Sequence, residues 1–498
     1  MKDRFRLAFI ALGGVVFALF LLFELLRRPG YFANSTYIGA LVAIEIVLAC
    51  LWRFEAVFFP VTMGCFLLAA TSLPLAGESF TIRWAFLGVG ALAGSVIWIR
   101  SIRPKHFGVF HLVALFSVLA ALASASTSGT PWIAFLKVGS LFLLFLYAST
   151  GGRVALAGRE QSFVQGLVLV CEILVFVTAA LDFAGYDLFG NPNNLGAFIG
   201  VIAVPVLLWA ALVAESRGER QRRYTALFLC LVLLYVSVCR AAIVADALVT
   251  IALTMGLRRP RLLLKAAFVA ALLLEMMAVA NPAHMSELMS SLSARFVFKL
   301  QAHRPEQGIF GSRMTPWDET ISAVAKHPWF GTGFGTSDLG GEQSNLEQSS
   351  IYTVEGTNRE HGSSYLALVE YMGLLGILPF LLLLFLLMRG AARVYKWMRR
   401  TGDPHHYAIP FAMVTLSGLV HAAFEDWLFA AGSYLCLFFW VVGFLLIDLS
   451  TDIDADLLRY KSVSARASAH GISQRVVGYT VSPTGMTGGA APSSSAIP

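Results

Sequence analysis

Long apolar runs separated by short polar interruptions make up most of the chain. Many runs extend for about 18–25 residues, the length that a helix needs to cross ~30 Å of hydrocarbon. Because lipid offers the backbone no hydrogen-bonding partners, these runs predict membrane-spanning helices. We expect about 14 helices, with 12 as the lower bound, near residues 5–26, 36–52, 56–76, 82–99, 107–125, 131–149, 162–183, 195–214, 223–239, 241–257, 262–280, 363–388, 407–422 and 428–448. The predicted fold class is an all-α polytopic membrane protein.

Two segments depart from this pattern and divide the chain into four parts. Residues 281–361 form a long loop in which Trp, Phe and Gly recur, which predicts a folded loop domain. Residues 450–498 are rich in Pro, Gly, Ser and Ala, which predicts a disordered tail. An N-terminal bundle of about 11 helices (1–280) and three C-terminal helices (362–449) make up the rest.

The distribution of Lys and Arg predicts the orientation in the membrane. With the N-terminus placed in the cytoplasm, the inner segments carry 22 basic residues, the C-terminal tail left aside, and the short outer loops carry three. Short inner loops are enriched in basic residues. We therefore expect both termini in the cytoplasm and the 281–361 loop on the outer face, which is the periplasm if the membrane is a bacterial inner membrane.

Composition agrees with this reading and excludes several kinds of site. Hydrophobic residues make up 57% of the 498 residues, charged residues make up 13%, and the mean hydropathy is +0.72. The net charge of +7 lies in short inter-helical loops, so it does not indicate a nucleic-acid partner. The six cysteines fall in or beside apolar runs without metal-binding or redox spacing, and we interpret them as small core residues. No motif predicts a metal site or a cofactor.

Two arginines are candidates for binding an anion on the outer face. Arg240 interrupts "LLYVSVCRAAIVADALV", and an arginine at membrane depth is costly unless it pairs or has a function. The alternative is a side chain that extends outward to water. Arg313 lies in the outer loop, where a solvated role is the alternative. The planar guanidinium makes two charge-assisted hydrogen bonds and so suits diphosphate oxygens.

His361 is the candidate catalytic residue. It lies in "NREHGSSYLALVEYMGLLG", where Ser363 or Ser364 is expected to cap the following helix. The positive end of that helix favours an anion and disfavours a protonated imidazole, which predicts a neutral histidine able to accept a proton. The alternatives are an interfacial histidine without a role and, for Glu360, either tuning of His361 or simple solvation.

Secondary candidates lie in the bundle and at its outer edge. Lys137 lies within a predicted span and either pairs with Glu172 or faces a polar cavity that holds an anionic headgroup. Asn191 and Pro192 predict a turn, after which Asn193 or Asn194 caps a helix.

The outer loop itself contains one predicted helix and a glycine run. Residues 316–326 predict an amphipathic helix with Pro316 in its first turn, and "HPWFGTGFG" ends it. The glycine run lacks the Gly-Lys-Ser/Thr ending of a nucleotide loop. It is either a turn-rich surface segment or backbone that lies close to a ligand.

The order and spacing of four motifs resemble the O-antigen ligase and polymerase superfamily. The motifs are "NPNNLG" at 191–196, "VCRAA" at 238–242, "GSRMTPWDETISAVAKHPWFGTGFGT" at 311–336 and "HGSSYLALVEYMGLLG" at 361–376. The sequence differs from the usual family pattern in having "VCR" in place of Ser-Arg and an acidic Glu360 before the histidine. The first 180 residues match only as generic spans.

The resemblance implies a glycosyltransferase of the bacterial inner membrane. Such an enzyme moves a glycan from undecaprenyl diphosphate to an acceptor glycan, a lipid A core or another hydroxyl, and it uses neither a metal nor a nucleotide sugar. By resemblance, Arg240 and Arg313 hold the diphosphate and His361 takes or orients the proton of the acceptor hydroxyl, with inversion at the anomeric carbon.

Other functions remain open on the sequence. A polymerase, a ligase and a protein O-oligosaccharyltransferase share this donor chemistry and differ in the acceptor. A flippase for lipid-linked glycans belongs to another class, and it would place charges along a central path between two related halves. Here the polar residues gather on one face and in one loop, which favours the enzyme.

Overall fold

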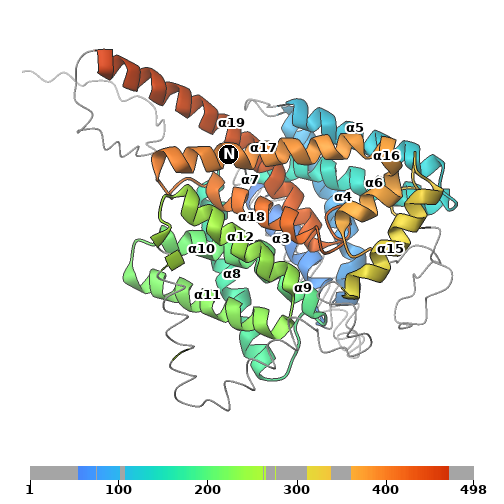
Figure 1. The fold of residues 1–498 in the computed structure, drawn as a ribbon, viewed down its shortest axis with the longest axis horizontal. Coiled ribbons are helices and arrows are strands. Elements are labelled where there is room, and N and C mark those ends of the chain that lie inside the picture. The colour runs from blue at the N-terminus through green and yellow to red at the C-terminus, as the bar shows by residue number, and fades with distance from the viewer. Residues whose placement is uncertain are drawn as a thin grey trace, which may run out of the picture. The chain divides into compact units, whose positions relative to one another are not determined.

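The computed structural model describes residues 54–73, 76–100, 107–156, 158–261, 263–264, 275, 311–337 and 361–469. Within these ranges every regular element is helical, as predicted (Figure 1). The chain divides into two units, residues 1–451 and residues 452–498, and the described part of the second unit is the end of one helix.

The described ranges contain the following helices. In chain order they are α3 (Phe54–Leu68), α4 (Ala76–Arg100), α5 (Val109–Ser126), α6 (Pro131–Tyr147), η2 (Ala148–Gly152), α7 (Arg153–Leu156), α8 (Glu160–Phe183), α9 (Pro192–Ala197), η3 (Phe198–Ala203), α10 (Val204–Leu212), α11 (Arg217–Ser237), α12 (Arg240–Gly256), α15 (Gly311–Lys326), α16 (Ser364–Gly376), α17 (Leu378–Thr401), α18 (Ala408–His421) and α19 (Tyr434–Ala469).

Seven helices in the described part are long and apolar enough to cross a membrane. They are Ala76–Arg100, Val109–Ser126, Pro131–Leu156, Glu160–Phe183, Pro192–Leu212, Leu378–Thr401 and Tyr434–Ile453. Two shorter apolar helices, Phe58–Leu68 and Ala408–His421, also coincide with predicted spans. The spans predicted near 5–26 and 36–52, and nearly all of 262–280, lie outside the described residues. The total of 14 therefore stays a prediction.

The predicted break before Arg240 is confirmed. Helix α11 ends at Ser237, and Val238 adopts the left-handed conformation with φ 51° before α12 begins at Arg240. Few β-branched residues adopt this conformation, so the packing around Val238 must hold it. The break gives α12 its own N-terminus, with Arg240 as its first residue.

The predicted single span over 363–388 is wrong. Gly373 interrupts α16 with φ 62°, and α17 begins afresh at Leu378. Helix α17 then continues to Thr401, so the basic stretch "RGAARVYKWMRR", expected as a loop, is helical. Hydropathy could not reveal the break, because the residues around Gly373 are apolar on both sides.

A loop within residues 311–337 packs against the kink at Gly373. The N–H of Leu374 donates to the carbonyl of Pro328 at 2.8 Å, and a Cβ at Gly373 would lie 2.6 Å from the N atom of Gly331. Helices α15, α16 and α5 meet in this region (Figure 1). A residue without a side chain is therefore required at this contact.

We expect Gly373→Ala to destabilise the protein by more than about 1 kcal/mol, because alanine adds both backbone strain and a steric clash. The measurement is the thermal midpoint in detergent. Gly139→Ala is the matched control, since a Cβ at Gly139 meets open space. Equal midpoints for the two variants would contradict this account of the kink.

Candidate functional site

Arg240 is held at the start of α12 by close backbone packing. Gly196 of α9 packs directly against Cys239, and a Cβ at Gly200 of η3 would lie 2.6 Å from that of Ala242. The side chain of Arg240 is half-buried, and it experiences electrostatic repulsion from Arg313. Two guanidinium groups held close enough to repel favour an anion between them.

Arg313 lies in the first turns of α15 and contacts the backbone next to His361. A Cβ at Gly362 would lie 3.0 Å from Cδ of Arg313, so the arginine packs directly against Gly362. Trp317, one turn further along α15, donates its ring N–H to the carbonyl of Gly362 at 3.4 Å. The guanidinium itself forms an ion pair with Glu425.

His361 is almost completely buried, with 1% of its surface exposed, and lies between two carboxylates. Its Nδ1 atom is 2.7 Å from Oδ2 of Asp426, and its Nε2 atom is 3.4 Å from Oε2 of Glu370. The edge of the ring meets the ring of Tyr371 at 5.0 Å between centroids.

The expectation of a neutral His361 is wrong. Burial alone lowers the pKa of His361, but its hydrogen bonds with Asp426 and Glu370 outweigh burial and raise the pKa to about 9. The positive end of α16 is a weaker influence than two adjacent carboxylates. The imidazole is therefore expected to be protonated at neutral pH.

Glu425 and Asp426 lie in the connection between α18 and α19. Hydrogen bonds hold this connection against the start of α16. The hydroxyl of Ser364 donates to the carbonyl of Glu425 at 2.7 Å and accepts from the N–H groups of Trp427 and Leu428, each at 3.0 Å. Ser363 is the N-cap of α16 but makes no side-chain cap bond. The predicted serine at the cap position is thus confirmed, but its hydroxyl forms no cap hydrogen bond, and the hydroxyl of Ser364 binds the neighbouring loop.

The glycine run forms a packed loop, residues 327–337, between α15 and α16. The N–H of Thr332 donates to the backbone carbonyl of Glu370 at 2.9 Å, and the hydroxyl of Ser337 donates to Oε1 of the same residue at 2.6 Å. Lys137 donates from Nζ to the carbonyl of Gly335 at 2.5 Å. This glycine loop therefore fixes the carboxylate that faces His361.

Helix α15 begins earlier than predicted. It starts at Gly311 rather than at residue 316, so Pro316 lies inside the helix and not in its first turn. The predicted end of the helix at the glycine run is confirmed, since α15 ends at Lys326.

The secondary candidates have different outcomes. Glu172 pairs with Arg222, Nε to Oε2 at 2.7 Å, so the expected pairing of Glu172 with Lys137 is wrong. Lys137 instead lies near the site, where it is attracted by Asp426. Asn191 is itself the cap of α9 and accepts from the N–H of Asn193 at 2.8 Å, which corrects the expected cap at Asn193 or Asn194. Glu360 lies outside the described residues.

Three acidic residues of the site were missed by sequence reasoning. Glu425 and Asp426 interrupt the apolar runs of α18 and α19, and Glu370 is an isolated carboxylate within an apolar run. Ionisable residues at such positions are candidates by default, so the signal was present in the sequence. Their partners could not be read from it, since Arg313 and Glu425 are 112 residues apart.

Within the described ranges, no group of three or more His, Cys, Asp or Glu side chains has the arrangement of a metal site. The expected independence from metals stays a prediction. The charge that could complement a diphosphate here comes from the two arginines, with Lys137 close to Asp426.

Residues 225–384 match the family model described as O-antigen ligase, and no curated protein matches the chain. This segment is therefore similar to O-antigen ligases. It contains Arg240, Arg313, His361 and Glu370, whereas Asp426 lies beyond its end. The match supports the O-antigen ligase and polymerase superfamily, which indicates a membrane glycosyltransferase acting with a lipid-linked glycan and an acceptor. Together with the apolar helices, it indicates a multi-pass membrane protein.

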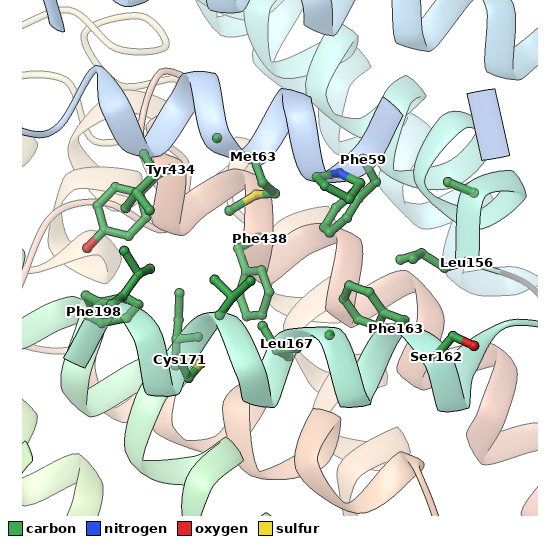
Figure 2. Close-up of a pocket in the computed structure, with 18 of the residues that line it drawn as sticks. Phe59, Met63, Leu156, Ser162, Phe163, Leu167, Cys171, Phe198, Tyr434 and Phe438 are labelled. Atoms are coloured by element: carbon green, nitrogen blue, oxygen red, sulfur yellow. The ribbon is translucent and has the colours of Figure 1, made fainter. Parts of the chain in front are cut away.

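An apolar cavity of about 360 Å³ lies between α3, α8, η3 and α19, outside the segment that matches the family model. It extends from Leu156 and Ser162 at one end to Phe198 and Tyr434 at the other (Figure 2). The hydroxyl of Tyr434 donates to the carbonyl of Asn194 at 2.9 Å. Because α9 and η3 pack against the start of α12, this end of the cavity lies close to the helix terminus that carries Arg240.

Proposed function

We propose that the protein is an inverting, metal-independent glycosyltransferase that moves a glycan from undecaprenyl diphosphate to an acceptor hydroxyl. The observation that carries the proposal is the meeting of Arg313 with His361 at Gly362, with Arg240 within electrostatic reach. Two guanidinium groups suit a diphosphate, and a histidine beside them suits proton transfer from a hydroxyl.

In the proposed reaction the acceptor oxygen attacks the anomeric carbon from the side opposite the diphosphate. The new C–O bond forms as the bond from the anomeric carbon to the phosphate oxygen breaks, and the electron pair of that bond goes to the diphosphate. Arg240 and Arg313 stabilise the negative charge that grows on the leaving group. The acceptor proton passes to His361 in its neutral form, from the side of the ring that faces Asp426.

We also propose that the reaction takes place on the periplasmic face of the membrane. The excess of basic residues in the inner segments supports cytoplasmic termini and a site on the periplasmic face of the bacterial inner membrane. The reaction then takes place where lipid-linked glycans and their acceptors are exposed to the periplasm.

The acceptor distinguishes ligase from polymerase, and a gene deletion tests it. Loss of long surface chains with single units still attached indicates a polymerase, and loss of all attachment indicates a ligase. The flippase is tested with the purified protein in liposomes, without acceptor. Transport of a lipid-linked sugar across the liposome membrane would contradict the glycosyltransferase function and support a flippase.

We further propose that the apolar cavity accommodates part of the prenyl chain of the donor. Its lining is almost entirely apolar, and one end approaches the helix that begins with Arg240. A chain in the cavity would thus place its diphosphate near the two arginines.

Filling the cavity is expected to weaken use of the prenyl donor. Gly64 and Gly166 line it, and a Cβ at either position meets open space. Gly166→Leu or Gly64→Leu would displace about two methylene groups of the prenyl chain from the cavity. Burial of each methylene contributes about 0.8 kcal/mol to binding, so KM for the donor should rise roughly tenfold. Gly139→Leu, on an exposed face of α6 outside the cavity, is the control. An equal KM in all three variants would exclude this cavity as the chain site.

A further inference from the structure

We propose that Glu370 is a positioning residue for the transfer reaction, which holds the ring of His361 from its buried side and stabilises the charged form of that ring. This inference rests on the proposed function, since it assigns a role within the same site.

His361 has an accessible side and a closed side. Asp426, at Nδ1, keeps 22% of its side chain exposed, whereas Glu370, facing Nε2, is completely buried. Nε2 is itself buried, and Oε2 of Glu370 lies on its side of the ring. Glu370 is therefore the polar group that Nε2 faces, at 3.4 Å. Of these two carboxylates, Asp426 marks the side of His361 that is open to protons and substrate.

The carboxylate of Glu370 is oriented by the glycine loop. Oε1 accepts from Ser337 at 2.6 Å, so Oε2 is the oxygen directed at His361. The backbone of Glu370 is fixed by Thr332. A carboxylate without solvent exposure is costly unless a cation compensates it. The imidazolium of His361, with Nε2 at 3.4 Å from Oε2, is a cation in position to do so.

Within the described residues, the charged groups near His361 come from four elements. Asp426 in the α18–α19 connection and Glu370 in α16 favour a protonated ring, and the phenol of Tyr371 lies 3.5 Å from Nδ1. Arg313 of α15 packs on Gly362 and pairs with Glu425, while Lys137 of α6 is attracted to Asp426. The carboxylates prevail, and they raise the pKa of His361 to about 9.

The consequence is a site that rests with His361 charged and becomes a base only when that proton leaves. A bound diphosphate meets an additional positive charge, which supports binding. The proton must then leave by way of Asp426 before the ring can accept another. Glu370 thus determines how much of the protein is ready to act as a base at a given pH.

The test is a titration of His361 by 15N NMR on the full chain in nanodiscs, with ¹⁵N-histidine labelling. The resonance is assigned by its loss in His361→Gln. We expect Glu370→Gln to lower the titration midpoint by about one pH unit or more, since an opposite charge beside the ring is removed. Glu370→Asp keeps the charge and should lower the midpoint by less. In transfer assays, the rising limb of the pH profile should move to lower pH in the same order.

Glu172→Gln is the matched control. Glu172 is also a buried glutamate in an apolar helix, but it pairs with Arg222. Its replacement should leave the midpoint of His361 unchanged. A midpoint equal to that of the wild type in Glu370→Gln overturns the inference. If that variant does not fold, an unchanged midpoint in Glu370→Asp overturns it, because the carboxylate is then one methylene farther from Nε2.

The titration needs no donor or acceptor, so the two proposals fail separately. A shifted midpoint in a protein that transfers no glycan would contradict the proposed function, while the interaction of Glu370 with the charged ring of His361 would stand. Transfer with unshifted midpoints would contradict the role of Glu370 alone.

Discussion

Replacing Arg313 with alanine is expected to lower the rate of glycan transfer by about 10²–10³-fold. Removal of one preorganised group that stabilises transition-state charge has an effect of this size. Arg313 is anchored by Glu425 and packs against Gly362, so its charge is preorganised beside His361. The measurement is kcat with saturating lipid-linked donor, together with binding of undecaprenyl diphosphate.

Three companion variants separate charge, geometry and folding in this experiment. Arg313→Lys keeps the charge and loses the planar fork, so it should retain only part of the activity. Glu425→Gln should weaken the anchoring of Arg313 and reduce kcat less than Arg313→Ala. Arg400→Ala, an exposed arginine at the end of α17, should transfer at the wild-type rate. Wild-type kcat in folded Arg313→Ala would exclude the assignment.

The general architecture and three residues of the candidate site could be predicted from the sequence, for different reasons. Ionisable groups within apolar segments are costly, so Arg240 stood out against its surroundings. Arg313 and His361 stood out through the motifs that contain them. Apolar runs of membrane length predicted six of the seven candidate spans in the described residues, and the seventh, Leu378–Thr401, was placed too early in the chain.

The partners of these residues depend on contacts between distant segments. Asp426 reaches His361 across 65 residues of sequence, and Ser337 reaches Glu370 across 33. Local rules could not foresee that Ser364 would bind a loop rather than cap its helix. The charge of His361 was mispredicted for the same reason, since the helix terminus is local and the carboxylates of Asp426 and Glu370 are brought in by folding.

Replacing His361 with alanine is expected to reduce transfer by about 10²–10⁴-fold, the usual contribution of a general base. His361→Gln should be similarly inactive, because an amide can fill the space but cannot accept the proton. Binding of undecaprenyl diphosphate should weaken only moderately, since the arginines remain. Both variants should elute as the wild type does in size-exclusion chromatography. Transfer at the wild-type rate by either folded variant would exclude His361 as the base.

The pH profile tests the same assignment in the unmodified protein. Hydrogen bonds with Asp426 and Glu370 hold the pKa of His361 at about 9, well above its ordinary 6.5, so the neutral form becomes common only in alkaline solution. If the neutral ring is the base, the transfer rate should rise about tenfold per pH unit from neutral pH and level off near pH 9. A rate that falls over this range would indicate that the protonated form is the active one.

Stability should change with pH in the opposite direction. A group whose pKa is raised by folding contributes stability that is complete below its unfolded value, here about 6.5, and that is lost as the pH rises through its folded value, here about 9. The thermal midpoint of the wild type should therefore decrease as the pH rises from about 6.5 to about 9. His361→Gln has no such proton to lose, so its midpoint should fall less over the same range. A parallel decline in both proteins would mean that the carboxylates of Asp426 and Glu370 do not stabilise a charged histidine, and the alkaline rise in rate would then need another titrating group.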